Sequence, residues 1–154
     1  MILDPRHYVL DHFGRNWGPL LAPWRDLLPD QFNIFMVNRF GDVVLITPDG
    51  SVHILDLGAD VMPRIAADLA EFWRLLPDYA PNWLLVPLAD ECVAAGMSLG
   101  QDECYSWRRP PYLGGKYELD NVEIVPVETH YATLGETHGR VQNLSDGMPF
   151  PTEP

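Results

Sequence analysis

The chain has 154 residues, 47% of them hydrophobic, and its 22 acidic and 10 basic side chains give a net charge of −12. This length and composition suffice for one domain with its own core, so we expect a single domain over residues 1–154. An acidic chain with Lys116 as its one lysine repels phosphate backbones, which argues against direct nucleic-acid binding.

The first forty residues predict short helical pieces over residues 5–12 and 19–28, which glycine and proline keep short. A three-stranded antiparallel meander is expected next. Gly41-Asp42 is a hairpin signal, and Pro48-Asp49-Gly50 favours a second turn. The strands are expected at residues 32–40, 43–47 and 52–57, with both faces apolar and therefore covered. One face is expected to hold Ile34, Met36, Val44 and Ile46, and the other Phe35, Val37, Val43 and Leu45.

Two helices are expected after the meander. Asp68 and Glu71 have the spacing of a helix N-terminus, and Pro77 and Pro81 are expected to end that helix. Pro87 suits the first turn of the next helix, which is expected to run to Gly96.

The last part of the chain predicts two strands and a long helix. Strands are expected over residues 104–108 and 122–125, and the helix carries one largely apolar face. That face holds Val127, Tyr131, Leu134, His138 and Val141. We therefore expect an α+β fold in which a central, mainly antiparallel sheet contains the meander and both later strands, covered by helices.

Patterns for catalysis and metal binding are not found. Cys92 and Cys104 show neither a CxxC pair nor a histidine spacing, so we expect two reduced thiols. His130 and His138 lack a metal-binding spacing, and we interpret His138 as a buried side chain with a backbone or carboxylate partner. Because GxSxG, P-loop and GxGxxG patterns are also missing, we expect no catalytic residue, no cofactor and no metal.

Localisation follows from hydropathy. No run approaches the about 18 apolar residues of a membrane span, and the first residues do not resemble a signal peptide. We expect a cytoplasmic protein without membrane contact.

Three separated blocks carry a resemblance to a known family. They are GDxxxxxxDGSVHxLD over Gly41–Asp56, CYxWxxPPxLGGxYxxDNxE over Cys104–Glu123, and LGxxHxxVxxLxDG over Leu134–Gly147. In order and spacing they resemble the C-terminal domain of bacterial type VI secretion immunity proteins, whose named members neutralise a secreted DNase toxin.

The resemblance implies an immunity protein, or antitoxin, that acts by binding. It implies a core over residues 41–147, preceded by an N-terminal helical segment over residues 1–40 and followed by a tail over residues 148–154. A weaker analogy, at the level of the fold, connects this arrangement with the SUKH immunity superfamily and implies a SUKH-like domain.

The implied partner is a cognate toxin, with a nuclease effector first and NAD-degrading, ADP-ribosylating and deaminase toxins as alternatives. Residues 1–40 carry no net charge, so the whole excess falls in residues 41–154, where it would attract a basic partner. Many bacterial cytosolic proteins are nevertheless acidic for solubility alone, so charge by itself does not identify the function.

Candidate toxin-binding residues are acids at predicted turns and the aromatic and arginine side chains of the loop from Trp107 to Tyr117. The other interpretation of this loop is structural, with its rings packed inward. The candidates are Asp42, Asp49, Asp60, Asp102, Glu103, Trp107, Arg108, Tyr112, Glu118 and Asp120. Two other functions stay open: a non-catalytic adaptor for a basic cellular partner, and a small hydrolase that uses His130 or His138 with a carboxylate.

Overall fold

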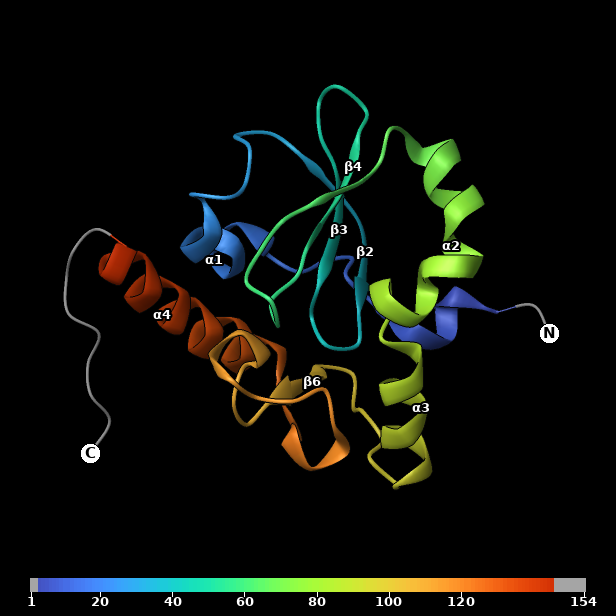
Figure 1. Cartoon of the computed structure of the whole chain (residues 1–154), viewed down its shortest axis with the longest axis vertical. Coiled ribbons are helices and arrows are strands. Elements are labelled where there is room, and N and C mark those ends of the chain that lie inside the picture. Colours follow the sequence, from blue (N-terminus) through green and yellow to red (C-terminus); the bar gives the residue numbers. More distant parts are fainter. Residues whose placement is uncertain (1–2, 146–154) are drawn as a thin grey trace.

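The computed structural model describes residues 3–145 and has the predicted α+β class (Figure 1). Five antiparallel strands form the main sheet, in the order β1-β2-β3-β4-β5. They are β1 (Val9–Leu10), β2 (Asn33–Asn38), β3 (Val43–Ile46), β4 (Val52–Leu55) and β5 (Arg64–Ala66). The predicted meander is confirmed as β2, β3 and β4. The tail predicted over residues 148–154 lies outside the described residues.

Four α-helices and a second sheet complete the described part of the chain. The helices are α1 (Trp17–Leu21), α2 (Leu69–Trp83), α3 (Val86–Ala94) and α4 (Val127–Ser145), and the second sheet pairs β6 (Glu103–Trp107) with β7 (Val122–Pro126). Short 3-10 turns lie at Pro5–Tyr8, Ala22–Trp24, Pro111–Leu113 and Leu119–Asn121. Figure 1 shows α2 on one side of the main sheet and α1 and α4 on the other.

The N-terminal segment is less helical than predicted. Only the turn at Pro5–Tyr8 forms before Val9 and Leu10 pair with β2. An open sheet edge offers unpaired backbone groups, and pairing with it outweighs the helical spacing of this segment. The second predicted helix is present as α1 followed by the turn at Ala22–Trp24.

A β-bulge in β2 alters the predicted faces of the meander. The register shifts between Ile34 and Met36, so Phe35 and Met36 pack on the same side of the sheet. Ile34 packs instead in the core that contains Val37. The predicted placement of Phe35 beside Val37 is therefore wrong, because one extra residue in a strand changes the alternation of its side chains.

Both faces of the main sheet are buried, as predicted. On one face, Phe72 and Leu76 of α2 pack against the sheet. On the other, Tyr131 and Leu134 of α4 pack in the same core as Leu45. The predicted apolar face of α4 is confirmed, since Val127, Tyr131, Leu134 and His138 are buried and Val141 is half-buried.

Helix α2 begins as predicted but continues past its two prolines. The Asp68 side chain accepts a hydrogen bond from the Glu71 N–H at 2.8 Å and so caps the first turn. Pro77 and Pro81 lie on the exposed side, where water can satisfy the carbonyls that a proline leaves without a donor. The prediction that these prolines end the helix is wrong, because the buried face of α2 holds the helix in place up to Trp83.

Strands β6 and β7 do not join the main sheet, contrary to prediction. They pair with each other and enclose a third core, in which Trp107 stacks on Phe40 at a ring distance of 5.1 Å. The flanks of the meander are already occupied by β1 and β5. A backbone hydrogen bond of 2.8 Å from the Tyr105 N–H to the Arg39 carbonyl links β6 to the segment that follows β2.

Two other predictions can be compared with the structure. Cys92 and Cys104 are both free and buried, as predicted. None of the helices within residues 3–145 is long and apolar enough to cross a membrane.

Candidate functional site

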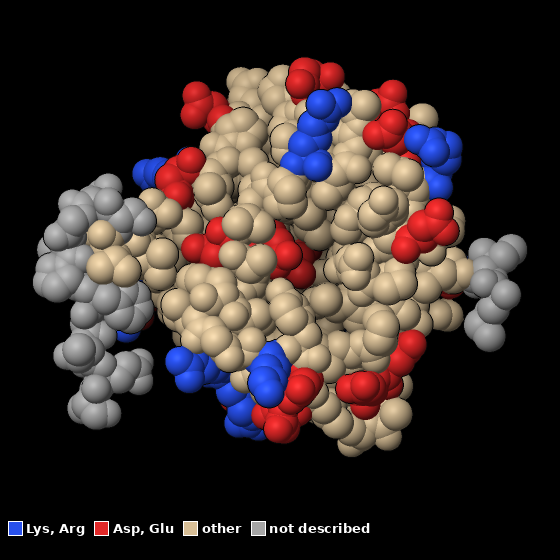
Figure 2. Space-filling model, viewed as in Figure 1, with Lys and Arg blue, Asp and Glu red and all other residues tan. Residues whose placement is uncertain are grey.

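A cleft of about 390 Å³ opens where one end of the main sheet meets the junction of α2 and α3. We call it the acidic cleft because all its charged residues are acids, although most of its walls are apolar. It is lined by Asp42, Asp56, Pro81, Asn82, Leu85, Pro87, Leu88, Glu91 and Tyr117. Figure 2 shows acidic side chains inside a hollow near the centre of this face.

The carboxylate of Asp42 is fixed at the cleft by two hydrogen bonds. Its Oδ1 accepts from the Leu57 N–H and its Oδ2 from Asn38 Nδ2, both at 2.9 Å. Burial raises the pKa of Asp42 well above its ordinary value and the charge of Asp56 adds to this, while the hydrogen bonds act against it. The prediction that Asp42 is an exposed turn residue is wrong, because the hairpin directs this side chain inward and leaves the residue 5% exposed.

Asp56 and Tyr117 converge beside Asp42. The Asp56 Oδ1 accepts from the Ala59 N–H at 3.0 Å, and burial raises the pKa of Asp56. A Cβ added at Gly58 would lie 2.9 Å from the Tyr117 hydroxyl and 3.5 Å from Asp56 Oδ1, so Gly58 makes room for both groups. Burial raises the pKa of Tyr117, and the charges of Asp56 and Asp42 raise it further, in keeping with a hydroxyl that faces two carboxylates.

The junction of α2 and α3 holds the opposite wall. Leu85 lies in the left-handed region, at φ 50° and ψ 44°, where leucine is uncommon, and the resulting sharp turn places Leu85 and Leu88 along the cleft. Asn38 Nδ2 donates both to Asp42 Oδ2 and to the Trp83 carbonyl at 3.0 Å. One amide group therefore joins the sheet end to the helix junction.

The hairpin that carries Asp42 is anchored on α4. The Tyr131 hydroxyl donates to the Gly41 carbonyl at 2.6 Å, and a Cβ at Gly41 would lie 2.5 Å from His130 Nε2. Gly41 also has φ 82°, so no other residue fits there without strain. His130 Nδ1 lies 2.7 Å from Ser106 Oγ, and burial lowers the pKa of His130 to about 4.

A charged network ties α4 to two distant segments. His138 Nδ1 lies 2.8 Å from the Asp60 carboxylate and His138 Nε2 lies 2.8 Å from Asp26 Oδ1. Asp60 Oδ1 also accepts from Trp24 Nε1 at 3.2 Å. Burial lowers the pKa of His138, but the hydrogen bonds to Asp26 and Asp60 outweigh burial, and the net result is a raised pKa. The predicted carboxylate partnership of His138 is confirmed.

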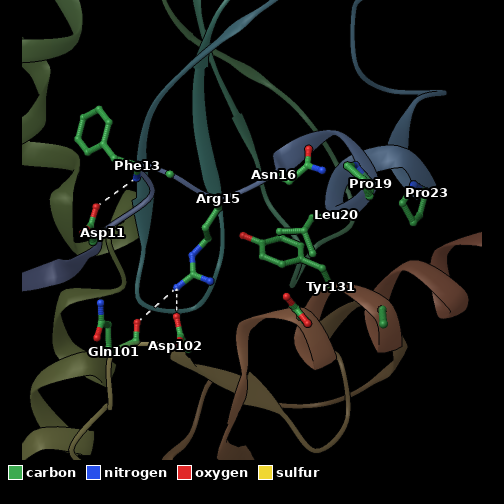
Figure 3. Close-up of a pocket in the computed structure, with 13 residues that line it drawn as sticks. Asp11, Phe13, Arg15, Asn16, Pro19, Leu20, Pro23, Gln101, Asp102 and Tyr131 are labelled. Carbon is green, nitrogen blue, oxygen red and sulfur yellow. Dashed lines mark hydrogen bonds and ion pairs between the residues drawn. The ribbon is translucent and has the colours of Figure 1, made fainter.

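A second groove, of about 660 Å³, lies between the N-terminal segment and α4 (Figure 3). Arg15 reaches across it and donates from Nη2 to the Gln101 carbonyl at 3.3 Å and to Asp102 Oδ1 at 3.2 Å. Phe13 lies at this groove with 81% of its surface exposed and points away from Tyr131 in Figure 3. Unlike the acidic cleft, this groove contains a basic side chain, that of Arg15.

The other predicted site residues lie in different parts of the structure and outside the acidic cleft. Asp60 is in the His138 network, Asp102 is paired with Arg15, and the Glu103 Oε1 accepts from the Gly100 N–H at 2.7 Å. Asp49 is exposed in the turn between β3 and β4, and its hydrogen bonds to Thr47 and Ser51 hold that turn together. This turn is at the opposite end of the meander from Asp42.

The loop from Trp107 to Tyr117 combines structural and exposed residues. Trp107 is buried on Phe40, and a Cβ at Gly115 would overlap the Arg109 carbonyl, so part of the loop shapes the fold. Tyr112 is half-buried, and its N–H donates to the Gly58 carbonyl at 2.8 Å. Arg108, Glu118 and Asp120 are exposed, and the latter two follow the cleft residue Tyr117 in sequence.

Sequence reasoning missed three residues of these surfaces. Asp56 and Glu91 are part of the acidic cleft, and Phe13 is part of the second groove. Glu91 carries no local signal, since only the tertiary fold brings α3 to the sheet end. Asp56 lies inside the strand predicted over residues 52–57, whereas the candidate acids were chosen at predicted turns, and in the structure the strand already ends at Leu55.

Metal-binding geometry is also missing from the part of the chain that the structure describes. Among residues 3–145, no group of three or more His, Cys, Asp or Glu side chains is arranged to hold a metal ion.

Comparison with known protein families gives a match for the region from β5 to α4. Residues 66–138 match the family described as T6SS immunity protein Tdi1, C-terminal. The match runs from the end of β5 to His138 of α4 and contains the block over Cys104–Glu123, but not the hairpin block over Gly41–Asp56. For that hairpin the resemblance stays a prediction. A search of curated proteins found no match. Residues 66–138 therefore belong to the family of C-terminal domains of type VI secretion system immunity proteins.

Proposed function

We propose that this protein is an immunity protein that binds and neutralises a cognate type VI secretion effector with nuclease activity. The observation that carries the proposal is the family of residues 66–138, whose described member is an immunity protein. We propose one immunity domain over the whole chain, acting in the cytoplasm of the bacterium that makes it. It acts by binding and not by catalysis.

The charge of the chain supports a nuclease as the partner. A nuclease binds a polyanion, so its substrate groove is basic, whereas this chain has a net charge of −12. An acidic protein is attracted to such a groove over long distances and competes with phosphate for the same arginine and lysine side chains. We propose that the bound immunity protein covers the substrate-binding surface of the toxin.

The face that contains the acidic cleft is the proposed contact surface. It combines the cleft carboxylates with exposed residues of the nearby loop, namely Arg108, Glu118 and Asp120, and with the half-buried Tyr112. Acidic and aromatic groups together suit a basic partner, because charge speeds encounter and aromatic side chains contribute most to affinity once water is excluded.

Co-expression with a candidate effector, sought first in the neighbouring genes, tests the proposal. We expect this chain to rescue growth of cells that express the effector, to purify with it, and to suppress its nuclease activity in vitro at a molar ratio of one to one. An effector with its catalytic residue removed should still co-purify, which separates binding from relief of toxicity. Growth inhibition that persists despite normal levels of folded protein would refute the immunity role and favour an adaptor for another basic partner.

A further inference from the structure

The acidic cleft contains three carboxylates and no base. Asp42, Asp56 and Glu91 line it, and none of its nine lining residues is lysine, arginine or histidine. Within the described part of the chain, no ion pair involves any of these three acids. By contrast, Asp102 in the second groove is paired with Arg15.

Two of these carboxylates are removed from water beside each other. Asp42 is 5% exposed, and burial raises the pKa of both Asp42 and Asp56. A buried carboxylate without a cation is costly unless something compensates its charge. A cation that entered the cleft would therefore gain more from these groups than from solvated surface acids.

The other residues that line the acidic cleft determine which kind of cation fits it. Pro81, Leu85, Pro87, Leu88 and the ring of Tyr117 form apolar walls that suit a hydrocarbon stem. No cluster of the described acids is arranged to hold a metal ion, so the site fits an extended organic cation better than a metal ion. A guanidinium is weakly hydrated, and its five N–H donors can serve two carboxylates and a tyrosine hydroxyl at once.

We propose that the acidic cleft receives an arginine side chain of the toxin, with its stem between the apolar walls and its guanidinium against Asp42 and Asp56. This inference rests on the proposed function and identifies the anchor within that interface. Arginine in a central, desolvated pocket is the residue type that most often dominates binding energy at such interfaces.

Asp56→Asn is the test variant, because the amide keeps the Oδ1 that accepts from the Ala59 N–H. Asp42→Asn is less suitable, since both of its carboxylate oxygens accept hydrogen bonds and the new NH₂ group would face a donor, either Asn38 Nδ2 or the Leu57 N–H. Asp30→Asn is the matched control. Asp30 is exposed and precedes β2, whose first residue, Asn33, pairs with Ile46 at the end of the meander away from Asp42.

The first experiment measures association and dissociation rates with the effector. Both variants remove one negative charge, so we expect small decreases in the association rate, with the smaller decrease for Asp30→Asn because it lies away from the cleft. Asp56→Asn should raise the dissociation rate by at least about tenfold, while Asp30→Asn leaves it within about twofold. Equal dissociation rates for the two variants, with wild-type binding intact, would overturn the arginine anchor but leave the immunity function standing.

The second experiment does not depend on the effector. Titration with N-acetyl-argininamide, followed by NMR, should shift the amide signals of Leu88 and Tyr117, and the neutral isostere N-acetyl-citrullinamide should not. Asp56→Asn should weaken the arginine response severalfold. Equal responses to the two compounds would refute the site, and a stronger response to N-acetyl-lysinamide would replace arginine by lysine as the anchor. If argininamide binds here but the effector does not bind the protein, the proposed function fails and the cleft serves another basic partner.

Discussion

His138 of α4 and Asp60, in the turn between β4 and β5, lie 2.8 Å apart although 78 positions separate them in the chain. The other ring nitrogen of His138 contacts Asp26 at 2.8 Å. An ionised carboxylate only accepts hydrogen bonds, so this geometry suits a ring that donates from both nitrogens, in keeping with the raised pKa of His138. This imidazolium joins the N-terminal segment, the main sheet and α4, and it makes the stability of the fold dependent on pH.

The first prediction concerns the alkaline side of that dependence. The pKa of His138 is raised above its ordinary value of 6.5 in the folded protein. The contribution of His138 to the free energy of unfolding is therefore fully present below about pH 6.5. It is lost as pH rises through the pKa that His138 has in the folded protein. We expect the difference in unfolding free energy between wild type and His138→Gln, from urea denaturation, to shrink between pH 6 and pH 9. A constant difference would show that His138 is neutral in the fold.

The second prediction concerns His130, whose effect on stability has the opposite dependence on pH from that of His138. Its pKa is lowered to about 4 by burial, so the unfolded chain binds a proton that the folded protein excludes. As pH falls from about 6.5 to about 4, this group should remove up to about 1.4 kcal/mol of stability per pH unit. His130→Met is expected to flatten the slope in this window. A slope unchanged by that substitution would assign acid sensitivity to other groups.

The third prediction tests the core shared by α4 and the main sheet. Leu134 is buried in the same cluster as Leu45 and Leu55, so Leu134→Ala should cost about 2–4 kcal/mol. Thr133, its exposed neighbour, provides the control, and Thr133→Ala should change stability by less than about 0.5 kcal/mol. Urea unfolding of both variants measures the two costs, and similar values would contradict the assigned face of α4.

These packed elements were the ones that sequence periodicity could predict. The stripe from Val127 to His138 and the strands of the meander have repeats that match one secondary structure, so burial follows directly. The bulge near Phe35 and the passage of α2 through Pro77 could not be predicted in this way, because tertiary packing overrides the local signal at both places.

The candidate surface was less predictable for a related reason. Whether an acid at a turn faces water depends on which backbone donors lie nearby, and Asp42 is directed inward by the N–H of Leu57, fifteen residues away. Glu91 reaches the same cleft only because α3 folds back against the sheet end. Long-range contacts of this kind leave no pattern in the neighbouring residues, and the effector, which decides what the surface must fit, is another chain.

The last prediction addresses the route by which the effector reaches this surface. The excess negative charge of residues 41–154 should steer a basic partner toward the protein, so stopped-flow association should slow as salt rises. Glu118 and Asp120 are exposed and follow the cleft residue Tyr117 in the chain, and their joint change to lysine should slow association about tenfold at low salt and reduce its salt dependence. Asp30→Lys should slow association less for each charge changed, because Asp30 precedes the end of β2 that lies away from Asp42 and the cleft, and salt screens charges that are far from the contact face. The dissociation rate separates steering from direct contact, since a residue at the rim changes it little. Association that responds neither to salt nor to these substitutions would leave the acidity as a solubility trait and assign recognition to aromatic contacts such as Tyr112 and Tyr117.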